Sequence, residues 1–372
     1  MLKPSPLKAL AAVVREVGGD FVLEEIELDA PREYEVRVKL VGCGICHTDI
    51  AVQKGFASPL PIVLGHEGSG IVESVGDKVT KVKPGDSVVL SYDYCASCPN
   101  CRINAPAYCY NFFAHNFGGS RPDDQSVPAH DLKNSIYSNF FGQSSFAQYA
   151  IAHERNTVPV SSSLPLELLG PLGCGIQTGA GTVLNSMKIR PNESLIIFGG
   201  GAVGLSALLG AKTVDETVVT VVEPNPARRL LAKELGATNV VDPATVTNML
   251  EYIQQLHQGG VQHAIDTTGI PSLIGTGVDS LMPNGTLYMI GVPPADATLP
   301  SNLLSMLLRG VGIKAVLEGD AVSNDFIPEL IKLYEDGKLP FDKLIKKYKF
   351  SDINQAIKDS LSGATVKPIL IF

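Results

Sequence analysis

The sequence feature that most restricts the fold is an alternation of apolar runs and helical stretches from about residue 195 to residue 315. Residues 195–198, 217–222, 261–266 and 286–292 have the composition of strands, and stretches with helical spacing separate them. The β-branched run 217–222 is typical of a strand that is covered on both faces. This alternation predicts an α/β fold with a parallel, doubly wound sheet and helices on both of its faces.

A glycine-rich loop follows the first of these predicted strands. Gly199, Gly201 and Gly204 complete the pattern G-x-G-x-x-G at the start of a predicted helix. Glycines at these places allow a tight turn, close approach to a pyrophosphate and close packing of helix on strand. Glu223 ends the next strand, where its carboxylate can accept hydrogen bonds from a ribose and repel a 2′-phosphate; a surface carboxylate is the alternative. The loop and Glu223 therefore predict NAD rather than NADP as the cofactor. Arg228 could partly offset the negative charge of Glu223.

Four of the seven cysteines fall within fifteen residues, with the spacing C-x2-C-x2-C-x7-C. They are Cys95, Cys98, Cys101 and Cys109. Thiolates at this spacing can converge on one cation, and an all-sulfur tetrahedral shell suits structural Zn²⁺. Two disulfides in a secreted protein are the alternative. Cysteine is sparse elsewhere and nothing resembles a secretory leader, so zinc and a reducing compartment are favoured.

Composition narrows the possible partners. The chain has 372 residues, 45% of them hydrophobic and 18% charged, with a net charge of −8. An acidic chain without a dense basic patch is a poor candidate for binding nucleic acid. No apolar run approaches the ~20 residues that span a bilayer. We therefore expect a cytoplasmic protein with a small-molecule partner, and neither a nucleic-acid nor a membrane partner.

The first ~90 residues consist of short β-type runs between turn signals, which predicts a compact antiparallel barrel or sandwich. Residues 104–139 are rich in Asn, Gly, Ser, Asp and Pro but also carry several aromatic residues. A solvated loop rarely holds so many aromatic side chains. We expect this segment to be a long loop at the rim of a pocket.

Three cysteines lie outside the four-cysteine cluster: Cys43, Cys46 and Cys174. A single buried cysteine is usually a small hydrophobe, and a single histidine such as His66 is usually a satisfied polar group. Spacing alone leaves open whether Cys46, His66 and Cys174 meet on a metal.

Several motifs nevertheless stand in the order found in the zinc-dependent medium-chain alcohol dehydrogenases, and the resemblance spans essentially the whole chain. The motifs are residues 44–49, 65–70, 95–109, 173–175 and 199–204. Within that family, residues 111–113, 316–320 and 340–345 look most like the aryl (benzyl) alcohol dehydrogenase branch.

The resemblance implies two zinc ions per chain. Cys46, His66 and Cys174 resemble the protein ligands of a catalytic zinc, an arrangement known for alcohol dehydrogenase, while the four-cysteine cluster resembles the structural site. Glu67 is expected behind the metal as a neighbour or alternate ligand. Asp49 should accept the other N–H of His66 and fix its tautomer; a helix cap is its alternative role.

Thr48 is placed by the resemblance to take the proton of the substrate hydroxyl. Many relatives end this relay in a histidine three positions further on, where this chain has Ala51. His47 is the nearest substitute, because imidazole titrates near neutral pH. The expected cofactor-binding residues are Gly199, Gly201, Ala202, Val203, Gly204, Glu223, Arg228, Thr178, Val292 and Lys367, of which Lys367 would contact the pyrophosphate.

The implied reaction is hydride transfer between a primary alcohol, aromatic or allylic, and NAD. An apolar pocket wall suits such substrates. The expected wall is Phe56, Tyr92, Phe112, Phe113, Phe140, Phe141 and Leu317. Two alternatives remain: a biosynthetic-pathway reductase of the same family, and a catalytically silent zinc- and NAD-binding member.

The resemblance also implies the domain arrangement. Residues 1–173 and 316–372 should form a GroES-like, zinc-binding catalytic domain, and residues 174–315 an NAD-binding Rossmann domain. Relatives associate through the cofactor domain, so we expect a homodimer or homotetramer with residues 286–292 as the edge strand.

Overall fold

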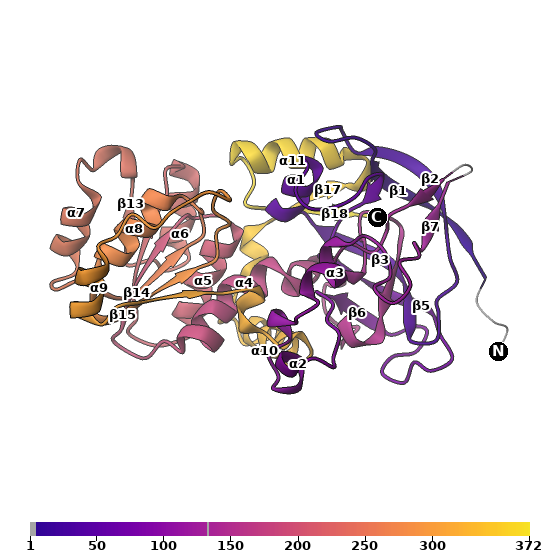
Figure 1. Ribbon diagram of the computed structural model, residues 1–372, viewed down its shortest axis with the longest axis horizontal. Coiled ribbons are helices and arrows are strands. Elements are labelled where there is room, and N and C mark those ends of the chain that lie inside the picture. Colours follow the sequence, from indigo (N-terminus) through magenta and orange to yellow (C-terminus); the bar gives the residue numbers. More distant parts are fainter. Residues whose placement is uncertain (1–4, 132–133) are drawn as a thin grey trace. The chain divides into compact units, whose positions relative to one another are not determined.

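The structure is a computed structural model that describes residues 5–131 and 134–372 (Figure 1). The chain divides into two compact units. Unit 1 comprises Met1–Gly175, Ala321–Ile331 and Ile345–Phe372, and unit 2 comprises Ile176–Asp320 and Lys332–Leu344. Within the described ranges, no helix is long and apolar enough to cross a membrane.

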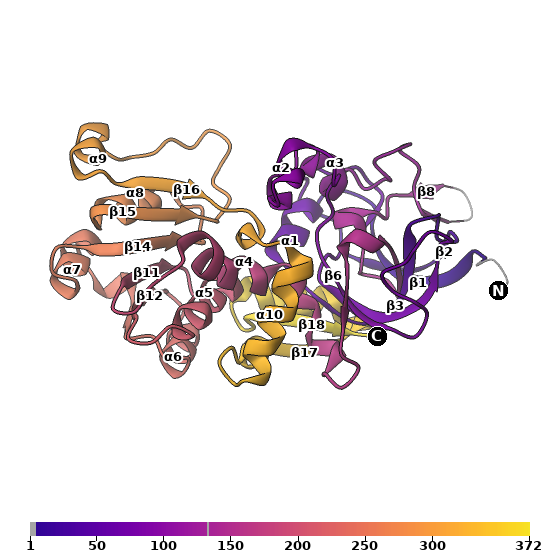
Figure 2. The same ribbon diagram turned by 90° about the horizontal axis from the view of Figure 1, so that it is seen from below.

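Unit 2 contains a six-stranded, all-parallel sheet with strand order β13-β12-β11-β14-β15-β16. Figure 2 shows its labelled strands in this order, from β16 to β12. The strands are β11 (Ser194–Phe198), β12 (Val218–Val222), β13 (Asn239–Val241), β14 (Val261–Asp266), β15 (Leu281–Met289) and β16 (Gly312–Ala315). The helices between them are α5 (Ala202–Lys212), α6 (Pro226–Glu234), α7 (Met249–Leu256), α8 (Pro271–Asp279) and α9 (Leu303–Arg309). This order is that of a Rossmann fold, which confirms the predicted fold class.

The prediction that residues 286–292 form the edge strand of this sheet was wrong. Residues 286–289 belong to β15, which pairs with β14 on one side and β16 on the other. Within the described chain β16 pairs only with β15, so β16 is the edge. The short run Gly312–Ala315 was missed because it has little apolar character.

The division into units also differs from the predicted domains. Cys174 lies in unit 1 rather than at the start of the cofactor domain. Residues 332–344, expected in the catalytic domain, belong to unit 2. The 3-10 turn Phe341–Leu344 contacts α5, and the rings of Tyr334 and Phe341 lie 4.7 Å apart. Tertiary packing therefore separates this segment from the two parts of unit 1 that flank it in sequence.

Unit 1 is built from two largely antiparallel sheets, which confirms the β-rich GroES-like architecture expected for the catalytic domain. One has the order β4-β1-β2-β7-β8 and the other β10-β6-β5-β3-β18-β17, with β9 also paired to β3. The first sheet comprises β1 (Leu7–Val14), β2 (Val22–Leu28), β4 (Ile62–Val63), β7 (Ala129–His130) and β8 (Ser135–Ile136). The second comprises β3 (Glu35–Gly44), β5 (Gly68–Val75), β6 (Ser87–Leu90), β9 (Tyr149–His153), β10 (Thr157–Val160), β17 (Ile345–Lys349) and β18 (Lys367–Ile371).

Helices are few in the first part of unit 1. They are α1 (His47–Gln53), α2 (Pro99–Arg102) and α3 (Phe112–Phe117), while α4 (Gly175–Gly181), α10 (Ser323–Glu335) and α11 (Ile353–Ser362) come later in the chain. The segment 104–139, predicted as one long loop, contains α3, β7 and β8. Its aromatic residues are explained by α3, because Phe112 and Phe117 pack against the buried core of unit 1.

Candidate active site

The four clustered cysteines form a small lobe around α2. Their sulfur atoms all lie within 4.8 Å of one another, and none of the seven cysteines forms a disulfide. Cys98 Sγ lies 3.5 Å from Cys101 Sγ, far beyond the ~2.05 Å of a disulfide. Backbone N–H groups point at the sulfurs, from Cys98 to Cys95 at 3.3 Å and from Asn111 to Cys109 at 3.4 Å. Such donors favour thiolates, and four convergent thiolates fit a structural zinc.

The second cluster is formed by Cys46, His66 and Cys174, all in unit 1. Their ligand atoms also lie within 4.8 Å of one another. His66 is fully buried, and its Nε2 has no hydrogen-bond partner among the described residues. An unpaired buried ring nitrogen is costly. Beside two cysteine sulfurs, this nitrogen supplies the third protein ligand that a catalytic zinc needs. These residues therefore fit the metal implied by the sequence.

Asp49 connects two of these candidate ligands. One carboxylate oxygen lies 2.9 Å from His66 Nδ1 and accepts from the backbone N–H of Gly65 at 3.0 Å. The other accepts from the N–H of Cys46 at 2.9 Å, which closes a capping box at the start of α1. Asp49 therefore combines the two roles that the sequence suggested, orienting His66 and capping α1.

Charge is concentrated around this cluster. The hydrogen bond with Cys174 lowers the pKa of Cys46 well below its usual value, against the effect of burial. Burial lowers the pKa of His66, but the charge and hydrogen bond of Asp49 outweigh it and raise that pKa. The shift of Cys46 favours the thiolate form, which is the form of cysteine that binds a metal.

The two residues expected to serve proton transfer lie at the start of α1. Thr48 is half-buried, and its hydroxyl lies 3.8 Å from Cys46 Sγ. His47 is exposed. Thr48 is therefore next to the candidate ligands, whereas nothing in the structure connects His47 to them.

Lys367 does not have the place expected for a pyrophosphate contact. Its side chain is 2% exposed, and its Nζ donates to both carboxylate oxygens of Glu67, at 2.8 and 2.9 Å, and to the carbonyl of Ile45 at 3.2 Å. All three donors of the ammonium are thereby used. The prediction that Lys367 contacts the cofactor is corrected, because β18 runs through the interior of unit 1.

The Glu67–Lys367 ion pair joins the segments that carry the candidate ligands. Glu67 follows His66 and accepts from the N–H of Gly175, next to Cys174, at 3.0 Å. Lys367 binds the carbonyl next to Cys46. Burial raises the pKa of Glu67 although the ammonium opposes this shift, and the charge of Glu67 raises the pKa of Lys367 against the effect of burial. Glu67 is thus held by Lys367 beside the ligand cluster.

Aromatic rings surround His66. Phe141 stacks on the imidazole at 4.4 Å and Phe140 meets its edge at 5.4 Å. Phe117, which the sequence analysis did not include in the pocket wall, contacts Phe140 and Phe141 at 5.8 and 5.2 Å. It also contacts Phe56 and Phe113, which are 47% and 57% exposed. The helical spacing of residues 112, 113 and 117 is the sequence signal that could have identified it.

The other predicted wall residues have different environments. Tyr92 is buried, its hydroxyl donates to the carbonyl of Ala321 at 2.5 Å, and its ring lies 5.8 Å from that of Phe112. Leu317 belongs to unit 2 and is 46% exposed, and Val292, predicted to contact the cofactor, belongs to the same unit and is 79% exposed. The structure therefore brings the Phe residues of unit 1 together, while Tyr92 is fixed in the core.

The glycine-rich loop leads from β11 into α5. Gly199 has φ +99°, and a Cβ on Gly204 would lie 1.9 Å from the carbonyl oxygen of Gly199, so both positions require glycine. Glu223 is buried and accepts from the backbone N–H of Gly200 at 2.7 Å and of Asn225 at 2.8 Å. Its carboxylate is thereby fixed beside the loop, where the fingerprint places the ribose of a dinucleotide.

The remaining predicted cofactor residues lie around this loop. Gly201 caps α5, which begins at Ala202 and Val203, and Val203 O lies near Gly179 of α4. Thr178, also on α4, is buried. Arg228 has a buried Nε without a partner among the described residues. These residues all belong to unit 2.

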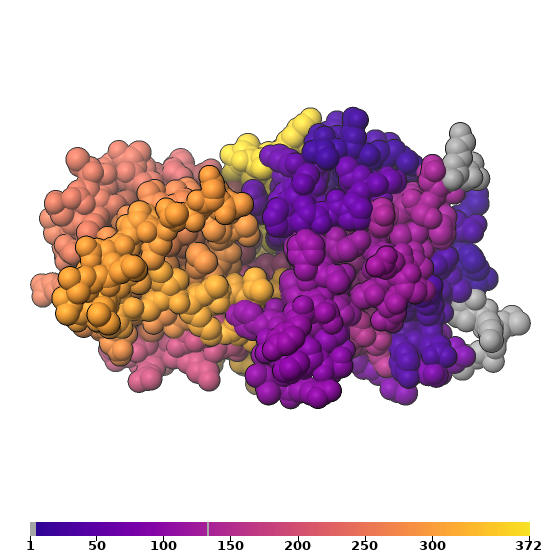
Figure 3. All heavy atoms as spheres, viewed as in Figure 1, coloured from indigo at the N-terminus to yellow at the C-terminus, as the bar shows by residue number. Residues whose placement is uncertain are grey.

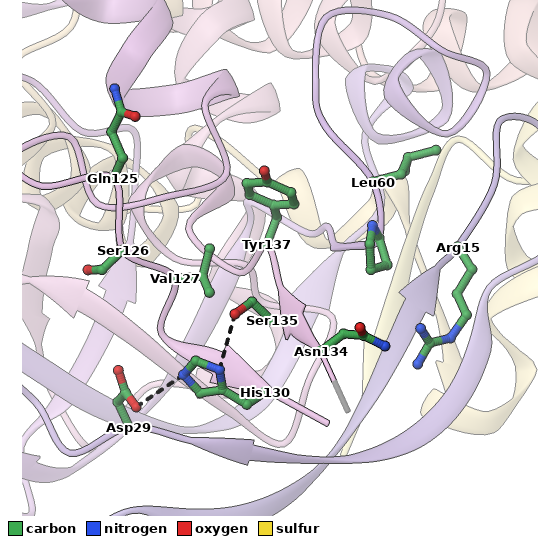
Figure 4. A pocket seen from close by; sticks show the side chains of 11 residues that line it. Arg15, Asp29, Leu60, Gln125, Ser126, Val127, His130, Asn134, Ser135 and Tyr137 are labelled. Carbon is green, nitrogen blue, oxygen red and sulfur yellow. Dashed lines mark hydrogen bonds and ion pairs between the residues drawn. The ribbon is translucent and has the colours of Figure 1, made fainter. Parts of the chain in front are cut away.

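A separate hollow of about 830 Å³ lies in unit 1 beside β7 and β8 (Figure 4). His130 lies between Asp29, at 3.6 Å, and Ser135, at 3.5 Å. Arg15 is paired with Glu24 and Asp131. None of the predicted site residues lines this hollow, so it is not the candidate active site.

Comparison with known proteins agrees with this description. The family model of the alcohol dehydrogenase GroES-like domain matches residues 32–162, and that of the zinc-binding dehydrogenase matches residues 202–336. Geraniol dehydrogenase from Castellaniella defragrans is 47% identical, over 98% of both chains.

Two solved structures are also similar. An alcohol dehydrogenase zinc-binding domain protein from Burkholderia ambifaria is 44% identical with a TM-score of 0.96, covering 99% of this chain and 100% of the other. Benzyl alcohol dehydrogenase from Acinetobacter calcoaceticus is 44% identical with a TM-score of 0.95, covering 98% and 99%. The chain belongs to the zinc-dependent medium-chain alcohol dehydrogenase family.

Proposed function

We propose that the protein interconverts a primary aromatic or allylic alcohol and its aldehyde, with NAD as hydride acceptor or donor and two zinc ions per chain. The observation that carries the proposal is the buried, unpartnered Nε2 of His66 beside two cysteine sulfurs. Benzyl alcohol is aromatic and geraniol is allylic, so the similar proteins act on alcohols of these two kinds. The phenylalanine cluster next to His66 offers such substrates an apolar wall.

In this proposal Cys46, His66 and Cys174 would hold the catalytic zinc, which would supply Lewis-acid polarisation of the substrate oxygen when bound. Asp49 keeps Nδ1 of His66 protonated and aims Nε2 at the metal position. Thr48 receives the proton of the substrate hydroxyl and passes it outward, with exposed His47 as the candidate for its release. The surrounding Phe residues exclude water from the reacting carbon.

The cofactor is held by unit 2. The N-terminus of α5 and the glycine-rich loop bind the pyrophosphate, and Glu223 binds the adenosine ribose. NAD is favoured over NADP because a 2′-phosphate would meet a buried carboxylate. Thr178, Val203 and Val292 are assigned to the nicotinamide, and Arg228 to the adenosine side. Seven cysteines without a disulfide are consistent with a reducing compartment such as the cytoplasm.

We propose that unit 2 also carries the subunit contact. β16 leaves one side of the sheet unpaired among the described strands. The helix α9, which directly precedes β16 in the chain, carries four leucines that are between 62% and 77% exposed: Leu303, Leu304, Leu307 and Leu308. The orange spheres of this part of the chain lie on the face turned to the viewer in Figure 3. An open strand edge beside exposed leucines fits a second copy of the chain, which gives a homodimer or a dimer of dimers.

The test combines metal analysis with a substrate panel. Benzyl alcohol, an allylic alcohol and ethanol are compared with NAD and with NADP, and zinc is measured in the wild type, Cys46→Ser and Cys101→Ser. We expect two zinc ions per chain, and preference for benzyl or allylic alcohol with NAD. Cys46→Ser should lose one zinc and turnover but stay folded, whereas Cys101→Ser should lose the other zinc and stability. One zinc in the wild type, or no turnover of any alcohol, would contradict the proposal.

A further inference from the structure

A strained turn lies against the candidate zinc ligand His66. Phe141 has φ +52° and ψ +33°, and Gly142 and Ser144 also have positive φ, at +63° and +51°. A non-glycine residue in the left-handed region is strained, because its Cβ lies too close to the following carbonyl oxygen. Such a residue persists only where its surroundings fix the backbone, and it is concentrated at functional sites. The turn 140–144 therefore needs a physical explanation.

The backbone of the turn is fixed by the segment that leads to His66. Ser144 Oγ donates to the carbonyl of Val63 at 2.6 Å, and the N–H of Phe146 donates to Leu64 at 2.9 Å. The N–H of Ser145 donates to Gly65 at 2.7 Å.

The fourth bond, like that of Ser144, comes from a side chain. Gln143 is fully buried, and its Nε2 donates to the carbonyl of His66 at 3.0 Å. Four consecutive carbonyl groups, residues 63–66, are thus bound by four consecutive residues, 143–146. These bonds tie the turn that carries Phe141 to the segment that carries His66, which sets the place of the Phe141 ring.

That place is the face of the His66 ring. Phe141 stacks on it with ring centres 4.4 Å apart and an angle of 26° between the planes, and Phe140 closes an edge. Asp49 binds Nδ1 at 2.9 Å. Asp49, Phe140 and Phe141 thus restrict the rotation of the imidazole, whose Nε2 has no hydrogen-bond partner among the described residues.

We propose that Phe141, held by the 140–146 turn, is a positioning residue that locks the His66 ring and slows the loss of zinc from the Cys46/His66/Cys174 cluster. The inference rests on the proposed zinc site. Replacing a residue that orients a metal ligand lowers metal affinity about 10- to 100-fold. We therefore expect loss of the Phe141 ring to speed zinc release at least about tenfold.

Zinc release into a chelator with a chromogenic readout is measured for the full-length wild type, Phe141→Leu, Phe141→Gly and Phe141→Tyr. Glycine adopts positive φ freely, so Phe141→Gly removes the ring and relaxes the backbone. Phe141→Tyr keeps the ring. Phe350→Leu is the control, since Phe350 is also buried and its ring centre lies 4.6 Å from that of Phe372, and no described ring contact joins it to His66. The visible spectrum of the cobalt-substituted proteins reports the ligand geometry independently of turnover.

Support requires that Phe141→Leu and Phe141→Gly release one zinc at least about tenfold faster than Phe350→Leu of similar thermal stability, with altered cobalt bands. Phe141→Tyr should stay within about twofold of the wild type, since it retains the stacked ring. Equal release in Phe141→Gly and Phe350→Leu would overturn the inference. Unchanged zinc content in Cys46→Ser would instead overturn the proposed zinc site, and the inference with it.

Discussion

Lys367→Met removes a buried ammonium and keeps most of the side-chain volume. Lys367 Nζ donates to both oxygens of Glu67 and to the carbonyl of Ile45, and both charged side chains are at most 2% exposed. Without it, the described partner left to the Glu67 carboxylate is the N–H of Gly175 at 3.0 Å. Removing one partner of a buried ion pair costs about 3–5 kcal/mol. We expect the free energy of unfolding to fall by that amount near pH 8.

The loss should depend on pH, because Glu67 can take up a proton. Burial raises the pKa of Glu67 above 4.5, and in the variant no ammonium opposes this shift. A carboxyl whose pKa is higher in the folded state contributes stability below the unfolded pKa, and that stability is lost as pH rises through the folded pKa. The difference between wild type and variant should therefore grow from about pH 5 to about pH 8.

The assay is urea unfolding at fixed free zinc. Glu67→Gln combined with Lys367→Met should recover much of the loss, because it removes the unpaired buried charge. Lys332→Met is the surface control, since its side chain is 74% exposed and pairs with Asp336 at 3.6 Å. It should cost less than about 1 kcal/mol. A pH-independent loss below about 1 kcal/mol for Lys367→Met, with a raised KM for NAD, would refute the ion-pair argument and favour a pyrophosphate contact.

Three further predictions concern other parts of the chain. Glu223→Ala should lower kcat/KM for NAD about tenfold or more and reduce the preference for NAD over NADP, because the buried carboxylate beside the glycine-rich loop is lost. An unchanged ratio of kcat/KM for NAD to kcat/KM for NADP in steady-state kinetics would contradict this prediction. Leu307→Asp, at a position 76% exposed on α9, should shift the protein toward monomer in analytical ultracentrifugation without unfolding it, and an unchanged mass would place the contact elsewhere. Asp93, buried between His115 at 2.7 Å and Arg155 at 2.5 Å, has its pKa lowered to about 2 by these partners despite burial. Its contribution of about 2 kcal/mol should be present above about pH 4 and lost as pH falls toward 2, and Asp93→Asn should abolish that part of the acid transition in pH-dependent unfolding.

Local motifs were the most predictable part of the protein. The four cysteines lie within fifteen residues, and the glycine-rich loop within six, so spacing in the sequence restricts spacing in space. The alternation of strands and helices predicted the Rossmann fold for the same reason, since each element follows from its own residues. The ligands Cys46, His66 and Cys174 are far apart in sequence, and only the family resemblance brought them together before the structure did.

The sequence alone therefore determined the fold class, the glycine-rich loop and the four-cysteine lobe. Tertiary structure decided that β16 forms the edge of the sheet, that Phe141 takes a left-handed backbone against His66, and that Lys367 binds Glu67, 300 residues away in sequence. The physical reason is that a turn or helix depends on neighbouring residues, whereas the partner of a buried charge depends on which distant segments pack together. No spacing rule along the chain specifies that partner.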